Sequence, residues 1–145
     1  MFKKILVPTD GSPLSDKAIN AAVEFAKAYG GSLVGICVSE PYPLSPLSEM
    51  NFSDERDAYE ERSRQVAGKN VEKIVAAASA AGVKCETLVA ESFAPHEEII
   101  KAANRLNCDV IFMASHGRKG LSKLFLGSET QKVLVNSAIP VLVFR

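Results

Sequence analysis

The sequence lacks an excess of either charge, and this absence excludes whole classes of protein. Lysine plus arginine and aspartate plus glutamate both number 17, so the formal net charge is zero. Dedicated nucleic-acid and anionic-membrane binders carry a basic excess, so we expect no nucleic-acid partner here. Any positively charged site in this protein must therefore be local.

Long hydrophobic runs are also missing. No apolar stretch approaches the roughly 20 residues that a membrane-spanning helix needs. The chain passes from MFKK directly into ILVPT, without the apolar core or the cleavage site of a signal peptide. We therefore expect a cytoplasmic protein with no membrane partner.

Cysteine is scarce, and no CxxC pair occurs. Cys37, Cys85 and Cys108 are an odd number, and two of them lie within or beside apolar runs. This usage indicates small buried side chains in a reducing compartment. Catalytic or redox thiols are the alternative interpretation.

Two familiar nucleotide signatures are absent as well. The sequence contains no GxxxxGK[ST] and no GxGxxG after its first apolar run. These absences exclude a Walker-type NTPase and an ordinary dinucleotide-binding protein.

What the sequence does contain is a regular alternation of apolar runs and helical patterns. Five runs read as strands, at 3–9, 32–38, 83–90, 109–115 and 139–145. Helical patterns lie between them, at 13–29, 54–81, 95–106 and 128–136. Unbroken Val, Ile and Leu strands that alternate with helices predict one α/β domain over residues 1–145, a doubly wound parallel sheet with helices on both faces.

Two segments near the middle of the chain are interpreted as solvent-facing. Residues 39–53 carry three prolines and four serines, and their length favours a lid or a mobile segment over a simple connection. The stretch DERDAYEERSR (54–64) is interpreted as the solvated opening of a helix with i,i+4 ion pairs rather than as a paired-carboxylate site. His96, in a first helical turn, is expected to face solvent.

The carboxyl ends of the strands are where chemistry is expected, because open parallel sheets bind ligands there, at the topological switch point. Thr9-Asp10 follows the first strand and His116-Gly117 follows the fourth. The stretch 114–130 is rich in glycine and serine. We expect Gly117 and Gly120 to adopt positive φ and turn their N–H groups toward an anion.

The end of the same stretch offers two readings. Gly127-Ser128 precedes a helix whose free N–H groups and dipole favour an anion. The Ser128 hydroxyl either caps that helix or donates to a phosphate oxygen. A loop with an N-cap and no ligand is the alternative.

Three segments together resemble the universal stress protein family: ILVPTDGS (5–12), ASHGRKGLSKLFLGS (114–128) and IPVLVFR (139–145). The likeness covers the whole chain and implies the strand order 3-2-1-4-5 and a homodimer. One branch of the family binds ATP through Gly, two residues, Gly, nine residues, Gly and Ser/Thr. Gly117 and Gly127-Ser128 match that pattern, whereas Ala114 stands where the first glycine is expected.

The resemblance implies an adenine nucleotide, ATP or AMP with or without Mg²⁺. Asp10 is expected to approach the ribose hydroxyls or a metal ion that bridges the phosphates. Val38 is expected to offer its backbone to the adenine edge. The complete set of expected ligand-binding residues is Pro8, Thr9, Asp10, Val38, Met113, Ala114, His116, Gly117, Arg118, Gly127, Ser128 and Glu129.

The last strand is apolar throughout and is expected at the sheet edge, where an exposed apolar strand must be covered. Antiparallel pairing of residues 139–145 with the same strand of a second copy would cover both.

The favoured function is a nucleotide-binding stress-response or signalling module that acts on an unknown protein partner with little or no turnover. The alternatives are a slow ATPase or phosphotransferase, with only Asp10 and His116 as candidate groups, and a ligand-free dimeric adaptor.

Overall fold

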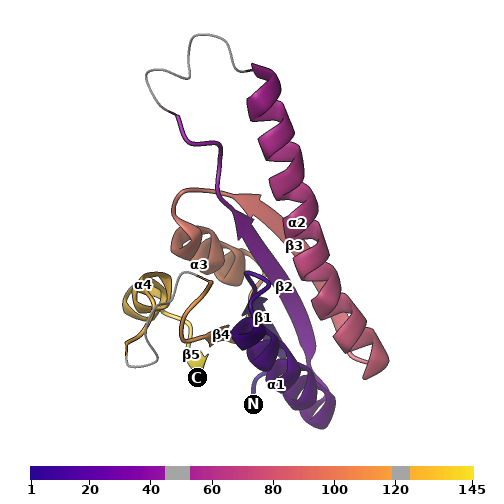
Figure 1. The fold of residues 1–145 in the computed structure, drawn as a ribbon. Helices are drawn as coiled ribbons and strands as arrows, with labels where there is room; N and C mark the ends of the chain where they lie inside the picture. Colours follow the sequence, from indigo (N-terminus) through magenta and orange to yellow (C-terminus); the bar gives the residue numbers. More distant parts are fainter. Residues whose placement is uncertain (45–52, 119–124) are drawn as a thin grey trace.

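The computed structural model describes residues 1–44, 53–118 and 125–145, and strands and helices alternate along these ranges (Figure 1). The elements are β1 (Lys4–Pro8), α1 (Pro13–Tyr29), β2 (Ser32–Ser39), α2 (Ser53–Ala80), β3 (Lys84–Glu91), α3 (Pro95–Arg105), β4 (Val110–Ala114), α4 (Ser128–Asn136) and β5 (Val141–Phe144).

The five strands form one parallel sheet in the order β3-β2-β1-β4-β5. β1 lies at its centre, since it pairs with β2 over Lys4–Pro8 and with β4 at Ile5 and Leu6. The chain winds outward in one direction through β2 and β3, and then in the other through β4 and β5. This order confirms the expected doubly wound fold and puts the switch point between β1 and β4.

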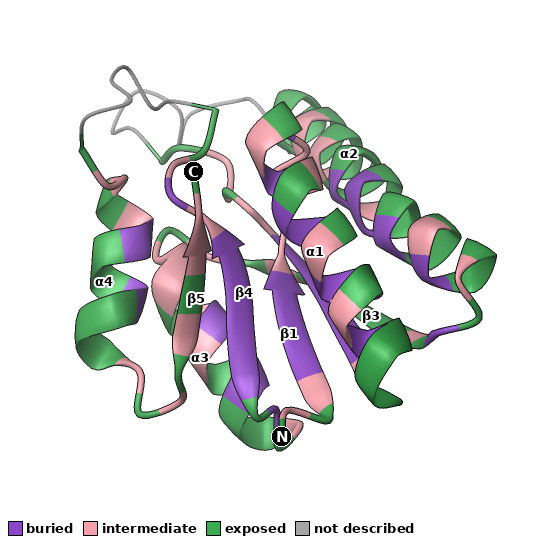
Figure 2. Cartoon of the chain, turned by 90° about the horizontal axis from the view of Figure 1, so that it is seen from below, coloured by how far each residue is buried: buried purple, intermediate pink, exposed green. Residues whose placement is uncertain are grey.

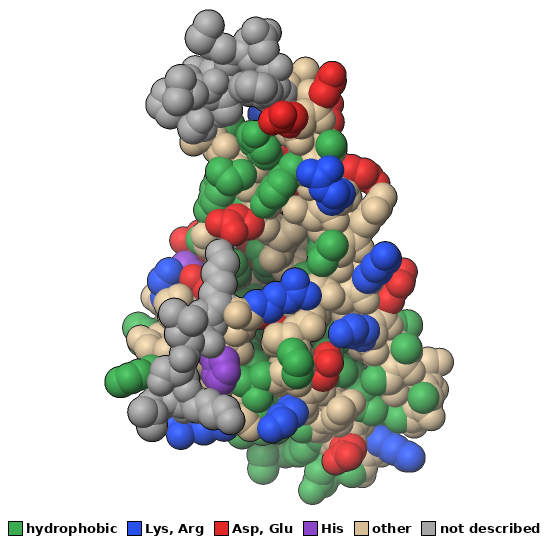
Figure 3. Space-filling view, viewed as in Figure 1, with side chains coloured by type: hydrophobic (Ala, Val, Ile, Leu, Met, Phe, Trp, Pro, Cys, Tyr) green, Lys and Arg blue, Asp and Glu red, His purple; other side chains and the backbone are tan. Residues whose placement is uncertain are grey.

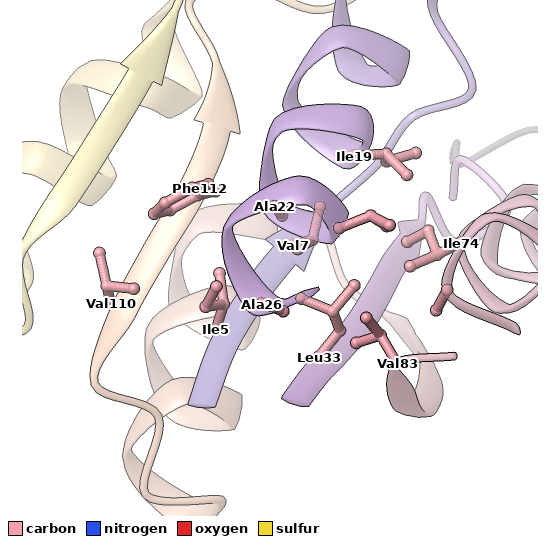
Figure 4. Close-up of a cluster of buried hydrophobic side chains, with 12 residues drawn as sticks. Ile5, Val7, Ile19, Ala22, Ala26, Leu33, Ile74, Val83, Val110 and Phe112 are labelled. Atoms are coloured by element: carbon pink, nitrogen blue, oxygen red, sulfur yellow. The ribbon is translucent and has the colours of Figure 1, made fainter. Parts of the chain in front are cut away.

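Alternate side chains of the central strands pack against opposite helical layers. Ile5 and Val7 contact the layer formed by α1 and α2; Figure 4 shows them beneath α1, beside Ala22 and Ala26, with Ile74 of α2 at the side of the cluster. Leu6 points the other way, into a second cluster with α3 and α4. Both faces of β1 and β4 are therefore buried (Figure 2), which is the physical reason for their uninterrupted apolar sequence.

The ends of α1 follow from local sequence. The Ser12 hydroxyl accepts a hydrogen bond from the Ser15 N–H at 3.2 Å, and Pro13 is the first helical residue. Gly30 ends the helix in the left-handed conformation, with φ of 64°. The Ser12 hydroxyl satisfies a free N–H group of the first turn, and Gly30 takes positive φ without the cost that a Cβ would bring, which explains where α1 begins and ends.

The helix α2 is longer than the sheet needs. Its 28 residues span about 42 Å, whereas the eight residues of β2 span about 26 Å. Only residues from Ala67 onward are buried in α2, and its first turns extend beyond the carboxyl ends of the strands (Figure 1). This extension brings the first half of α2 beside the edge of the sheet at which the strands end.

The boundaries differ from the expected ones at two places. The expected loop 39–53 is shorter, since β2 includes Ser39 and α2 begins at Ser53; residues 45–52, on which the lid hypothesis falls, lie outside the described part. β5 forms the sheet edge but comprises only Val141–Phe144, and Leu142 on it is 47% exposed. No helix in the described ranges has the length and apolar character needed to cross a membrane.

Candidate functional site

A cavity of about 650 Å³ opens at the carboxyl ends of β1, β2 and β4, beside the extension of α2. Figure 3 shows this side of the molecule, where the surface is hollowed between α2 and the sheet. Its volume lies within the range of small-molecule sites. All twelve residues expected from the sequence line it: Pro8, Thr9, Asp10, Val38, Met113, Ala114, His116, Gly117, Arg118, Gly127, Ser128 and Glu129.

Asp10 holds two turns together at the base of this cavity. Its Oδ1 accepts the Ser12 N–H at 2.9 Å, and its Oδ2 accepts the Arg118 N–H at 2.8 Å. Burial raises the pKa of this carboxyl, but the hydrogen bonds from Ser12 and Arg118 outweigh it, so the pKa lies below the ordinary 3.8. Asp10 is therefore a carboxylate at neutral pH, and both of its oxygens already accept backbone N–H groups.

Gly117 is a glycine because it lies against Asp10. A Cβ at this position would come within 2.5 Å of the Asp10 Oδ2, too close for any contact. The expectation of a positive φ at Gly117 is wrong, since among the described glycines only Gly11, Gly30 and Gly82 have one. Gly120, given the same role, lies outside the described residues. Close approach, rather than an unusual backbone conformation, explains this glycine.

Gly127 packs against the end of the same loop. Its N–H donates to the Ser115 carbonyl at 2.7 Å, and a Cβ would lie 3.1 Å from the Cα of His116. Gly127 is itself the N-cap of α4, without a side-chain cap hydrogen bond, so of the two alternatives for the Ser128 hydroxyl the helix cap is wrong, and donation to a phosphate oxygen stays a prediction. Ser128 is the first helical residue, and its hydroxyl does not serve as a cap.

The first turn of α4 is the part of the cavity best suited to an anion. The N–H groups of the first helical residues have no partner within the helix, and the helix dipole adds positive charge there. Thr130, buried in this turn, donates its hydroxyl to the Ala114 carbonyl at 3.0 Å and so fixes α4 to the end of β4. The Arg118 side chain lies beside this loop and approaches Gly11.

His116 is oriented by a neighbouring hydroxyl rather than by an acid. Its Nδ1 lies 3.1 Å from the Ser115 Oγ, and no carboxylate in the described ranges forms an ion pair with it. A general base normally has a third group that fixes its ring and stabilises the charge it gains. The arrangement therefore gives little support to acid–base catalysis by His116.

Glu129 forms a connection that the sequence did not indicate. Its Oε2 accepts the backbone N–H of His96 at 2.8 Å and lies 2.9 Å from the His96 Nδ1, while its Oε1 pairs with Lys132 at 3.0 Å. Partial burial raises the pKa of this carboxyl, but Lys132 and His96 lower it to a net value below 4.5. The expectation of a solvent-facing His96 is wrong, since its side chain is only 16% exposed.

The wall formed by α2 is the part of the site that sequence reasoning missed. Its charged and polar opening predicts a solvated segment, and the expected i,i+4 pairing does occur between Arg56 and Glu60, at 2.9 Å. The sequence does contain a signal for this wall: the side chains of this segment that do not form such pairs recur at helical spacing, which places them on one face of α2. The α2 residues that line the cavity are Tyr59, Arg62, Ser63, Val66, Ala67 and Asn70.

The described part of the cavity does not offer a complete set of protein ligands for a metal ion. No group of three or more histidine, cysteine, aspartate or glutamate side chains comes together among the described residues. Asp10, the expected metal ligand, accepts two backbone N–H groups instead. A cation at this site would thus have to bring most of its ligands with it, for example as phosphate oxygens and water.

The three cysteines are free thiols in the described structure. Cys37 and Cys108 are buried, and burial raises the pKa of Cys37 and raises that of Cys108 to about 11. Burial raises the pKa of Cys85 as well. Thiols with raised pKa values are poor nucleophiles, which favours the expected structural role.

Comparison with known proteins identifies relatives of this chain, both by sequence and by structure. The universal stress protein YxiE of Bacillus subtilis and a universal stress protein of Thermus aquaticus are each 33% identical to this chain, with full coverage of both sequences. The solved structure of MJ0577, from Methanocaldococcus jannaschii, superimposes with a TM-score of 0.83 at 28% identity, covering 99% of this chain and 96% of that one.

Two further solved structures share the fold at lower identity. One is a universal stress protein in complex with cAMP, with a TM-score of 0.70 and 22% identity. The other is the Archaeoglobus fulgidus universal stress protein in complex with dAMP, with a TM-score of 0.70 and 14% identity. The sequence model of the universal stress protein family matches residues 1–145, and the chain therefore belongs to the universal stress protein family.

Proposed function

We propose that this protein binds an adenine nucleotide, ATP or AMP, in the cavity at the β1/β4 switch point and acts as a stress-response or signalling module with little or no turnover. The observation that carries this proposal is the convergence of the motif residues. Segments around Asp10, Val38 and Gly117, far apart in sequence, line one cavity with the first turn of α4.

The cavity has the two chemical ends that a nucleotide requires. Val38, Met113 and Ile99 supply apolar surface for a base and sugar. The first turn of α4 and Arg118 supply N–H groups and positive charge for the phosphates. Asp10 lines the same cavity beside Gly117, where a ribose hydroxyl could donate to its carboxylate, or where a phosphate-bound Mg²⁺ could take one of its oxygens.

Relatives lend support to the ligand class. Two universal stress proteins with this fold were solved with cAMP and with dAMP, which are both adenine nucleotides. An adenine nucleotide is accordingly the first ligand to test.

We infer low turnover because the candidate catalytic groups, Asp10 and His116, already take part in hydrogen bonds within the protein. Hydrolysis needs a base that positions water and a cation or arginine that stabilises the transferred phosphate. Asp10 accepts two N–H groups, and among the described residues the Ser115 hydroxyl is the one partner that orients the His116 ring. We therefore infer that the bound nucleotide is a signal read by a protein partner in the cytoplasm, rather than a substrate.

Equilibrium titration tests the proposal directly. ATP and AMP are titrated with and without Mg²⁺, and the purified protein is denatured so that any released nucleotide is identified by mass spectrometry. Saturable binding supports the proposal, and single-turnover hydrolysis with labelled ATP then measures the turnover. Absence of binding by both nucleotides would instead favour a ligand-free adaptor.

A further inference from the structure

One face of α2 continues from the core of the protein into the cavity. The residues of its buried half pack on the sheet at helical spacing, for example Ala67 and Ile74. The same stripe continues toward the helix N-terminus at positions i, i+3, i+4 and i+7, so these side chains share one face. They form what we call the α2 wall of the cavity: Tyr59, Arg62, Ser63 and Val66.

Arg62 differs from the other arginines of this helix. Arg56 pairs with Glu60 at 2.9 Å, and Arg64 pairs with Glu61 at 3.4 Å. Arg62 lines the cavity, and within the described ranges no carboxylate lies within ion-pair distance of it. A guanidinium for which the described residues supply no anionic partner, at the wall of a largely apolar cavity, can bind a ligand.

The α2 wall lies at the base end of the proposed nucleotide site. The Tyr59 hydroxyl donates to the Glu40 carbonyl at 3.4 Å, and its ring packs edge-on against Tyr42 with centroids 5.4 Å apart. These contacts hold Tyr59 beside the end of β2, two residues beyond Val38. Val66, although it lines the cavity, is 47% exposed, so an apolar surface there is left uncovered.

The phosphate end lies farther down the helix. Asn70 and the Arg118 side chain both approach Gly11 so closely that a Cβ there would collide with them. Asn70 follows Arg62 by eight residues, or about 12 Å along the helix axis. Arg62 and Arg118 therefore serve different ends of the cavity.

We propose that Arg62 is a ligand-binding residue that lays its planar guanidinium against the face of the adenine base. The proposal rests on the nucleotide-binding function proposed above. Guanidinium groups stack on aromatic rings, whereas an ammonium lacks the planar face for stacking. With Val66 and Tyr59 beside it, Arg62 would cover the side of the base that the sheet leaves open, while the phosphates remain at α4 and Arg118.

The test compares Arg62→Ala, Arg62→Lys and, as matched control, Arg64→Ala. Arg64 lies in the same helix, is ion-paired and does not line the cavity. Affinities for adenosine, AMP and ATP are measured by calorimetry on each variant. We expect Arg62→Ala to weaken all three ligands by a similar factor of about tenfold, Arg62→Lys to recover little of the loss, and Arg64→Ala to match the unmodified protein.

Two results would overturn the inference while leaving nucleotide binding intact. One is a loss that is absent for adenosine and grows from AMP to ATP, which would make Arg62 a phosphate ligand. The other is unchanged affinity of both Arg62 variants for all three ligands. If the unmodified protein binds none of them, the proposed function itself fails, and the inference fails with it.

Discussion

Asp10 joins two turns that lie 108 residues apart in the chain, and its charge is part of that connection. Because hydrogen bonds hold its pKa below 3.8, the folded state favours the ionised carboxyl more than the unfolded state does. The resulting stabilisation is fully present above the unfolded pKa and is lost as the pH falls through the folded pKa. Asp10 therefore connects the two turns, an interaction that we call the Asp10 clasp, and it is also a candidate ligand-binding residue.

Replacing Asp10 by Asn tests this clasp. The amide keeps one good acceptor, so one of the two backbone N–H groups loses its partner, and we expect the free energy of unfolding at neutral pH to fall by about 1.5 kcal/mol. Urea titrations at neutral pH and in steps below 3.8 measure the difference, which should shrink as the unmodified protein loses its charge. Asp57→Asn, at an exposed position of α2, is the control; a pH-independent difference would contradict the clasp.

Ala114 stands where the ATP-binding pattern of the family has its first glycine. It ends β4, lines the cavity and accepts the Thr130 hydroxyl through its carbonyl. We expect Ala114→Gly to tighten ATP binding about tenfold, because in the proposed binding mode the methyl would occupy space that a phosphate or the ribose needs. Calorimetry with ATP and AMP measures this effect. Equal affinity before and after the substitution would show that the methyl does not touch the ligand.

Among the elements, α3 depends on another helix for its start. Its N-cap residue, Ala94, makes no side-chain cap hydrogen bond, and Glu129 of α4 supplies the missing acceptor to the His96 N–H. The two helices that cover one face of the sheet are thus joined at the ends that approach the cavity. A carboxylate at the N-terminus of α3 is also favoured by the helix dipole.

We expect Glu129→Ala to lower the free energy of unfolding by about 1 kcal/mol, the usual worth of a cap. Glu129→Gln, which keeps an acceptor oxygen, should lose less. Chemical denaturation measures both. Glu97→Ala is the matched control, since its side chain is in the first turn of α3 but 72% exposed. A loss for Glu97→Ala as large as that for Glu129→Ala would argue against the cap.

At the scale of the whole molecule, the two edges of the sheet differ. β3 carries charged residues along its edge, among them Lys84 and Glu91, whereas β5 reads VLVF. Charges protect an edge strand from pairing, and an apolar edge invites it. The homodimer through 139–145 remains our prediction, with β5 pairing antiparallel across a two-fold axis.

Leu142→Lys tests this dimer, because it adds a charge to the exposed side of β5, where Leu142 is 47% exposed. We expect the variant to sediment as a monomer at concentrations where the unmodified protein sediments as a dimer. Val89→Lys, on the opposite edge strand and 39% exposed, should leave the mass unchanged. A monomeric unmodified protein, or a Leu142→Lys variant that remains dimeric, would refute pairing through this strand.

The sequence by itself determined the elements and the part of the sheet at which the candidate site lies. Buried strands must be apolar on both faces, and helix ends need caps and stops, so β1 and α1 can be read from local pattern with Ser12 and Gly30 at the boundaries. Carboxyl ends of parallel strands meet at one edge, which is why the twelve expected residues line one cavity.

The tertiary structure alone decided the contacts within that cavity. The Glu129–His96 connection spans 33 residues, and the Asp10–Arg118 clasp spans 108. The role of Arg62 depends on how far α2 extends beyond the sheet, which its polar sequence conceals. Such contacts depend on where whole helices and turns lie relative to one another, and the periodicity of a segment carries no information about its distant neighbours.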